Sequence, residues 1–468
     1  MERQATAEGI GLEPEIARRA DLKTACRHGD KKSGRGGGCA FRGAKLALQP
    51  IADAAHLVHG PITCQGHSWD SRPTDSSGSR LHRLTFITDI GEMDIIYGGE
   101  AKLAKAIEEI AHKYSPGAVF VYQTCLPAMI GDDIGAVCKA MEARCDIPVI
   151  PVDAPGFAGD MVHGNEFGGK VLLDHVIGRL EPGYSTPTDI NIIGEYNVAG
   201  ELSQVDPLLR ELGVRVLASI PGDGRYQDIA RSHRARAAVS LCSRALANLA
   251  QHMRERHGIP YVEGSFYGIS NTSNTLRALA ALLARQGGLA DLPSRTESLI
   301  VREEARAWAG LDACRKRLEG KRVLLVTGGV KSWSMASALS EIGLTVVGTS
   351  MHKSTPGDRD KALRLMSSPS CLHEGLSGQA MYSLLRDQKV DVVLAGFGAQ
   401  FVAARAKAAW VEINHHRLRA LTGYQGMVRL AMDIDRSCAN PVLNQVRSPA
   451  PWERPVGTDL AECGAWPG

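Results

Sequence analysis

Short apolar runs rich in β-branched residues alternate with amphipathic stretches along most of this chain, and this alternation constrains the fold more than any other feature. It is typical of doubly wound α/β domains, in which buried parallel strands are joined by helices. The predicted strands are 118–122, 148–152, 189–193, 215–220, 237–241, 322–327, 345–348 and 390–395. The predicted helices are 100–113, 134–144, 243–257, 272–285, 297–318 and 333–342.

The length of 468 residues is too great for one hydrophobic core, so about three domains are expected. Polar segments that begin with glycine or proline indicate boundaries near 181–188 and 318–321. The predicted divisions are a disordered N-terminal tail at 1–38, α/β domains at 39–185, 186–318 and 319–440, and a C-terminal extension at 441–468.

The C-terminal extension is rich in proline and glycine, so we expect it to wrap a surface rather than to extend a sheet. We expect Cys463 within it to be an incidental thiol. Neither feature suggests a role in a binding site.

Charge and hydropathy argue against several classes of protein. Lys and Arg number 54 against 51 Asp and Glu, and the net charge of +3 is spread along the chain, so nucleic acid is not an implied partner. The first residues lack the apolar core of a signal peptide, and no stretch approaches the ~20 apolar residues of a membrane span. We therefore expect a cytoplasmic protein with no membrane partner. Its 11 cysteines are expected to serve as thiols or metal ligands rather than in disulfides.

Three cysteines in the first predicted domain are candidate metal ligands: Cys39, Cys64 and Cys125. None belongs to a CxxC pair, which argues against a zinc ribbon or a thioredoxin-type redox pair and favours ligands gathered by folding.

Further candidates follow predicted strands, where open parallel sheets bind their ligands. Cys242 follows the strand at 237–241, and we expect it to open a helix whose positive end favours the thiolate. Gly328 and Gly329 follow the strand at 322–327, and their N–H groups can approach a ligand closely and donate to sulfide. A glycine pair alone is weak evidence, because most such pairs only form turns.

Longer stretches around these residues resemble the α-type subunits of the nitrogenase family, most closely those that act as scaffolds for cofactor assembly. The resemblance covers about 39–452, and its clearest stretches are CAFRGAKLALQPIADAAHLVHGPITCQGHSWDSRPTDSSG, VFVYQTCLPAMIGDDI, CSRALANLAQHMRERHGIPYVEGSFYGIS and LLVTGGVKSWSMASALSEIGLTVVGTS. It implies three Rossmann-like domains around a central cluster cavity.

The resemblance also implies which residues hold metal clusters. Cys39, Cys64 and Cys125 would hold a [4Fe–4S] cluster whose fourth ligand comes from a β-type partner subunit, in an α2β2 heterotetramer. Cys242 would hold one end of an iron–sulfur precursor of the iron–molybdenum cofactor. Gly328 and Gly329 would line the same cavity, and Lys331 would place a positive charge beside the anionic cluster.

The residue type at position 414 distinguishes members of this family from one another. This chain has Asn414 there, in WVEINHHRLRALTGYQGMVRLAMDID. The catalytic α subunit that the segment resembles has a histidine there, which ligates molybdenum, whereas asparagine is a poor ligand for that metal. We therefore expect a site that holds a cluster loosely and releases it. His415 or His416 could swing in as a replacement ligand, but solvated or capping loop histidines are the more ordinary reading.

The resemblance implies the α-type subunit of a cofactor-assembly scaffold rather than a free-standing enzyme. Such a subunit receives a precursor cluster from a radical-SAM donor protein. Molybdenum and homocitrate are installed with help from the nitrogenase iron protein, and the product passes to the apo catalytic nitrogenase. The interface cubane is expected to be structural or an electron relay.

Three alternatives remain at this point. One is a nitrogenase catalytic α subunit, against which Asn414 counts. Another is a related two-component reductase such as the dark protochlorophyllide reductase, against which Cys242 counts. The third is a simple iron–sulfur electron carrier, which would hold fewer irons.

Overall fold

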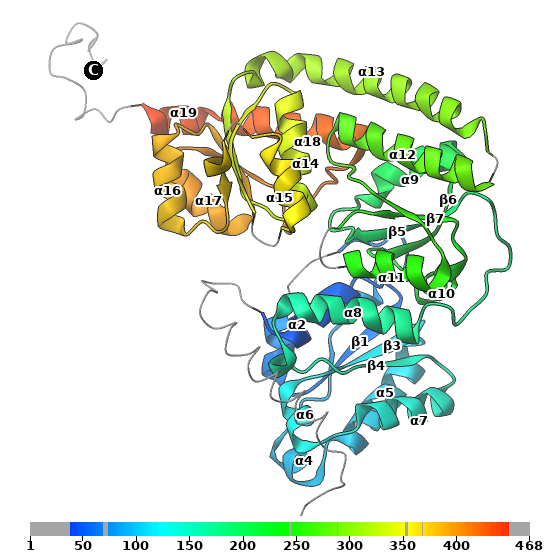
Figure 1. The fold of residues 1–468 in the computed structure, drawn as a ribbon. Helices are drawn as coiled ribbons and strands as arrows, with labels where there is room; N and C mark the ends of the chain where they lie inside the picture. Colours follow the sequence, from blue (N-terminus) through cyan, green and yellow to red (C-terminus); the bar gives the residue numbers. More distant parts are fainter. Residues whose placement is uncertain are drawn as a thin grey trace, which may run out of the picture.

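The structure is a computed structural model that describes residues 38–68, 74–242, 246–287, 289–351, 354–366 and 368–448. Three parallel sheets flanked by helices follow one another along the chain (Figure 1). The predicted α/β class with three Rossmann-like domains is therefore confirmed. Cys463 and nearly all of the predicted N-terminal tail lie outside the described residues. Within the described ranges, every helix is too short or too polar to cross a membrane.

The first domain contains a four-stranded sheet with the order β2-β1-β3-β4. Every strand pair in it is parallel, and the central strands β1 and β3 are buried along their whole length, as expected of a sheet covered on both faces. Its strands are β1 (Ala54–His59), β2 (Phe86–Ile87), β3 (Ala118–Gln123) and β4 (Val149–Val152). Its helices are α2 (Ala40–Leu48), α3 (Ile62–Ser68), η1 (Leu81–Arg83), α4 (Glu92–Tyr97), α5 (Glu100–Tyr114), α6 (Cys125–Ile130), α7 (Ile134–Cys145), η2 (Gly156–Ala158) and α8 (Met161–His175).

Helices α2 and α8 cross in near backbone contact, and glycines make this possible. A Cβ at Gly43 would lie 2.1 Å from the Met161 carbonyl oxygen, and one at Gly164 would lie 1.9 Å from the Ala40 carbonyl oxygen. No other residue fits at either position without moving a helix. The crossing places Cys39, which precedes α2, next to the loop that leads into α8.

The second domain also has a four-stranded parallel sheet, in the order β6-β5-β7-β8. Its strands are β5 (Asp189–Glu195), β6 (Arg215–Pro221), β7 (Ala237–Ser240) and β8 (Tyr261–Glu263). Its helices are α9 (Leu202–Glu211), α10 (Tyr226–Arg231), η3 (Ser232–Arg234), α11 (Ala247–His257) and α12 (Ile269–Gly287). Helix α11 begins later than predicted, at Ala247 rather than at residue 243.

The third domain has a five-stranded parallel sheet with the order β11-β10-β9-β12-β13. Its strands are β9 (Arg322–Leu325), β10 (Thr345–Ser350), β11 (Leu372–His373), β12 (Val392–Ala395) and β13 (Ala409–Glu412). Its helices, with the connecting α13, are α13 (Leu292–Leu318), α14 (Val330–Glu341), α15 (Pro356–Leu363), η4 (Pro369–Cys371), α16 (Gly378–Asp387), η5 (Phe397–Ala399), α17 (Gln400–Arg405), α18 (Gly423–Cys438) and α19 (Pro441–Arg447).

Shared hydrophobic cores hold the domains together. One cluster joins the second sheet to the third through α12, α13 and α18, and α13 runs along both domains (Figure 1). Another joins the first sheet to the second through α8 and α11. The three sheets therefore keep fixed positions relative to one another. The domain boundaries at 185/186 and 318/319 stay predictions.

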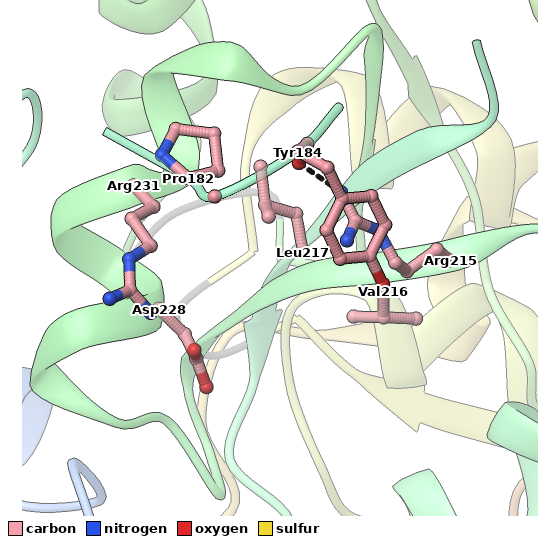
Figure 2. A pocket seen from close by; sticks show the side chains of 8 residues that line it. Pro182, Tyr184, Arg215, Val216, Leu217, Asp228 and Arg231 are labelled. Atoms are coloured by element: carbon pink, nitrogen blue, oxygen red, sulfur yellow. Dashed lines mark hydrogen bonds between the residues drawn. The ribbon is translucent and has the colours of Figure 1, made fainter. Parts of the chain in front are cut away.

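Asp189, the first residue of β5, links the segment at 184–186 to β6, the edge strand of the second sheet. The carboxylate is buried and accepts hydrogen bonds from Arg215 Nε at 2.7 Å and Nη2 at 2.6 Å. It also accepts from the Thr186 backbone N–H at 2.8 Å and from the Thr186 hydroxyl. Arg215 in turn stacks on the Tyr184 ring at 3.9 Å and donates to the Tyr184 carbonyl at 3.0 Å (Figure 2).

We call the contacts of Asp189 with Arg215 and Thr186 the Asp189 clamp. Its Arg215, together with Tyr184, forms one wall of a small cavity of about 220 Å³ at the sheet edge, with Asp228 and Arg231 on the other side (Figure 2). None of the predicted site residues lines it. Because its best-placed cation, Arg215, is already paired with Asp189, we interpret this cavity as a result of packing the segment at 182–184 against β6.

We predict that Asp189→Asn lowers the free energy of unfolding by about 2 kcal/mol at neutral pH, since charged hydrogen bonds are lost. Burial alone would raise the pKa of Asp189, but the hydrogen bonds from Arg215 and Thr186 outweigh it and lower that pKa. The stabilisation is therefore present above the unfolded-state pKa of about 4 and is lost as the pH falls through the folded-state value. Denaturant unfolding at neutral and at acidic pH measures both effects.

The matched control is Asp206→Asn, which removes an exposed partner of Arg210 within α9. Such surface pairs contribute at most about 1 kcal/mol, so this variant should unfold like the unmodified protein. Equal losses in the two variants, or a loss at Asp189 that persists at acidic pH, would contradict the clamp.

Candidate functional site

The structure brings the predicted cysteines Cys39, Cys64 and Cys125 together at one end of the first sheet. A Cβ placed on Gly156 would lie 2.8 Å from Cys125 Sγ and 3.2 Å from Cys39 Sγ. Burial raises the pKa of the Cys64 thiol, and the neighbouring Cys125 and Cys39 raise it further. Like charges have this effect only over a few ångströms. All three side chains are half-buried.

Adjacent parallel strands explain why these cysteines meet. Strands β1 and β3 are paired in the sheet, and the helices that carry Cys64 and Cys125 follow their carboxyl ends. The two turns are joined where Thr124 donates from its backbone N–H and its hydroxyl to the His59 carbonyl, at 3.1 and 3.0 Å. Cys39 arrives from the chain before α2, through a bridge to Asp160.

The three thiols are not spaced as the ligands of one metal ion. Among the described residues, no group of three or more His, Cys, Asp or Glu side chains is spaced to hold one metal ion. A cubane, by contrast, spreads its thiolate ligands over different irons. The missing side chain at Gly156 keeps space open beside two of the sulfurs.

The helices around these cysteines carry large exposed apolar side chains. In α4, Met93, Ile96 and Tyr97 are exposed, and in α6, beside Cys125, Met129 is 76% exposed. Ile62, at the start of the helix that carries Cys64, is also exposed. Groups of exposed apolar side chains on a soluble domain usually mark an interaction site.

A second site lies where the three domains meet, in a cavity of about 410 Å³. Residues of the first domain that line it include Met161, Val162 and Asn165. The predicted residues that line it are Cys242, Gly328, Gly329, Lys331, Asn414 and His415. Residues from distant parts of the chain, singled out separately in the sequence, thus share one cavity.

Cys242 reaches the cavity directly beyond β7. A Cβ at Gly194, which has a φ of +95°, would lie 2.4 Å from the Cys242 Cβ, so glycine is needed at that position. The expectation that Cys242 opens a helix is wrong, because α11 begins at Ala247. Its placement therefore rests on the strand end rather than on a helix dipole.

The glycine pair forms the turn between β9 and α14. Gly329 has a φ of +62°, which an L-residue rarely adopts, and its N–H donates to Ser354 Oγ at 3.0 Å. That N–H is therefore already engaged, contrary to the expected donation to sulfide. Lys331 donates to the Ile413 carbonyl at 3.3 Å, and its ammonium lies 4.9 Å from the centre of the Tyr267 ring.

Asn414 lies in the loop after β13, and its side chain bonds to the loop after β9. Its Oδ1 accepts from Thr327 Oγ1 at 3.0 Å, and its Nδ2 donates to the Val326 carbonyl at 3.2 Å. The amide thus joins two loops of the cavity wall. His416 is exposed and packs against the Phe397 ring, with centroids 5.9 Å apart, whereas His415 lines the cavity.

Sequence reasoning missed a set of buried charged and polar side chains at this cavity. Glu195 and Arg417 line it, as does the buried Tyr267, and the fully buried Glu201 lies behind Arg417. Burial raises the pKa of Glu195, and the charge of Glu201 raises it further. Glu195 could have been found, because it ends a strand whose predicted end is at residue 193. Arg417 could not, since its partner Glu201 is 216 residues away.

Comparisons with known proteins agree with this geometry. Residues 39–439 match the family model described as nitrogenase component 1 type oxidoreductase. The chain is 53% identical to the nitrogenase iron–molybdenum cofactor biosynthesis protein NifE of Bradyrhizobium diazoefficiens, over 96% of this chain and 83% of that protein. It is 48% identical to NifE of a Nostoc species, over 92% and 91% of the two chains.

Among solved structures, the chain resembles two determinations of nitrogenase Cp1. One, at pH 6.5, has a TM-score of 0.80 and 24% identity over 91% of this chain and 93% of the other. The other, at pH 5, has a TM-score of 0.79 and 26% identity over the same shares. These structures support the fold, and the more similar sequences place the chain within the family. The chain therefore belongs to the nitrogenase component 1 type oxidoreductase family and, within it, to the group of iron–molybdenum cofactor biosynthesis proteins named NifE.

Proposed function

We propose that this chain is the α-type subunit of a scaffold that holds an iron–sulfur precursor cluster while it matures to the iron–molybdenum cofactor of nitrogenase. The observation that carries the proposal is the cavity between the three domains, which gathers Cys242, the Gly328–Gly329 turn, Lys331 and Asn414. Relatives named for cofactor biosynthesis, at 45–54% identity, support the same role. The chain acts as a scaffold rather than as a free-standing enzyme.

Three cavity residues have distinct tasks in this proposal. The thiolate of Cys242 anchors one end of the cluster, and the charge of Lys331 offsets the cluster's negative charge. The cavity also takes up the molybdenum and homocitrate that complete the cofactor. Asn414 lines the wall without offering a strong metal ligand, so the finished cofactor can leave.

The cysteines of the first domain have a separate role. Cys39, Cys64 and Cys125 supply three ligands of a [4Fe–4S] cluster, and the β-type scaffold subunit NifN supplies the fourth, in an α2β2 complex. The exposed side chains of Met93, Ile96, Tyr97 and Met129 support this interface, because an assembled complex would bury them.

Other partners follow from the same proposal. The precursor cluster comes from the donor NifB, the nitrogenase iron protein assists maturation, and the apo catalytic nitrogenase accepts the product. We place these steps in the cytoplasm, where a reducing environment keeps cysteine ligands as thiols.

The catalytic α subunit, the main alternative, is not favoured. This chain is 53% identical to a relative named for cofactor biosynthesis but only 24% identical to a nitrogenase Cp1 structure. Asn414 lines the cavity, and the resemblance implies that the catalytic α subunit has a molybdenum-ligating histidine at this position.

Two variants test whether the sites are separate. In the anaerobic complex with NifN, we predict that Cys242→Ala loses the larger cluster and keeps the cubane, because Cys242 lies in another domain and lines another cavity. Cys125→Ser should instead lose the cubane and weaken subunit assembly, since it leaves one iron of the cubane without its thiolate. Iron content and electron paramagnetic resonance distinguish the outcomes.

Each variant serves as the control for the other, and Cys145→Ser serves for both, because Cys145 is a half-buried thiol at the end of α7. An intact cubane signal in Cys125→Ser would refute the interface ligand set. Unchanged loading of Cys242→Ala from the precursor donor would refute the anchor.

Asn414 allows a test of cofactor release. We predict that Asn414→His retains molybdenum-containing cofactor, because an imidazole nitrogen adds a metal ligand, and a net ~2.8 kcal/mol would slow release about a hundredfold. A transfer assay to the apo catalytic protein, at equal cofactor loading, measures the rate.

Asn414→Ala is the control, because any change at this position also breaks the bonds to Thr327 and Val326. Slow transfer only in the histidine variant supports the assignment. Transfer at the unmodified rate in the histidine variant would mean that partner docking or His415 governs release.

A further inference from the structure

A deeply buried ion pair joins two domains at the central cavity: Arg417 lines the cavity, and Glu201 lies behind Arg417. The side chain of Glu201 is 0% exposed and that of Arg417 is 4% exposed. Glu201 precedes α9 of the second domain, and Arg417 lies in the loop between β13 and α18 of the third. Neither residue belongs to the ligand set proposed above.

The guanidinium of Arg417 bonds in two directions at once. Its Nε and Nη2 donate to Glu201 Oε1 at 2.8 and 2.5 Å. Its Nη1 donates to the Ile413 carbonyl at 3.2 Å and also to the Asn414 carbonyl. One cation therefore ties the backbone on either side of Asn414 to a carboxylate of another domain.

Glu201 is itself held firmly. Its Oε2 accepts from the Ala199 backbone N–H at 2.9 Å, and its carbonyl accepts from Thr422 Oγ1 at 2.8 Å. The carboxylate is thus fixed within the second domain, and its backbone also bonds the loop after Arg417. A rigid anchor of this kind can define where a loop lies.

The same loop is held from its other side by the side chain of Asn414, which bonds to Val326 and Thr327 after β9. Loop residues 413–417 are therefore fixed between the glycine turn of the third domain and the carboxylate of the second. Because Asn414, His415 and Arg417 all line the cavity, the position of this loop sets the shape of its wall.

We propose that Arg417, through its pair with Glu201, is a positioning residue that holds the loop with Asn414 and His415 against the bound cluster and so controls how firmly the cluster is retained. This inference rests on the proposed scaffold function. Arg417 acts through the loop backbone, whereas Cys242 acts as a ligand.

The choice of variants follows from the burial of the pair. Arg417→Met alone leaves Glu201 as a buried charge without its cation, next to the second buried carboxylate of Glu195, and such variants are often too unstable to study. The double variant Glu201→Gln/Arg417→Met removes both charges of the pair together, and Lys331 remains as a cation that acts on Glu195. The control is Arg419→Met, which alters an arginine with a side chain that is 62% exposed.

In the anaerobic complex with NifN, loaded with precursor cluster, we expect the double variant to fold and to keep its cubane signal. We expect it to transfer the larger cluster about tenfold faster and to show an altered resonance line shape for that cluster alone, because the loop no longer has one position. Hydrogen exchange should rise at the backbone amides of residues 413–418. The Arg419→Met control should match the unmodified complex in all three measurements.

Unchanged transfer rate and line shape in the double variant would overturn the positioning role. If the double variant does not fold, Arg417→Lys decides, because lysine keeps the cation but cannot bond the carboxylate and both carbonyls together; an unmodified transfer rate there would also overturn it. Failure of the unmodified complex to hold any larger cluster would instead contradict the scaffold function itself.

Discussion

The direction of the parallel strands is the constraint on which both sites depend. A parallel sheet places the loops after all its strands at one edge, and here such edges from different domains face one cavity. The end of β5 and the segments after β5, β7, β9 and β13 line it, through residues 194–196 and 198, 241–242, 326–331, and 414, 415 and 417. The hydrophobic cores that join the sheets keep those edges facing each other. The residues of such a site need not be close in the sequence, because the packing of the domains brings them together.

The two sites differ in the physical character of their surroundings. The cysteines of the first domain are half-buried and are surrounded by exposed apolar side chains, which suits a cluster completed by a second protein. The central cavity instead has charged side chains of both signs: the buried Glu195 and Arg417 and the half-buried Lys331 line it, and the buried Glu201 lies behind Arg417. Charges in a low-dielectric site act strongly on an anionic ligand, so this set can orient a cluster without adding metal ligands.

The sequence predicted the fold class well because most central strands are apolar along their whole length. Strand β1 escaped prediction because its sequence, AAHLVH, contains two histidines that look out of place in a core. The structure satisfies them with partners distant in sequence: His56 Nδ1 lies 2.8 Å from the Tyr122 hydroxyl, and His59 Nε2 lies 2.9 Å from Asp132 Oδ2. Polar residues in a strand can be recognised as buried only when such partners are known. The Glu201–Arg417 pair could not be predicted for the same reason. Cys242 and the glycine turn could be predicted, because each follows the end of a predicted strand.

The most direct test of the scaffold account is the metal content of the anaerobic complex of this chain with NifN, before and after incubation with the precursor donor. The account predicts about four irons per heterodimer for the cubane alone. It predicts several more after loading, and molybdenum only once maturation is complete. A complex that stays at about four irons whatever the donor would contradict it. Such a protein would be an iron–sulfur electron carrier.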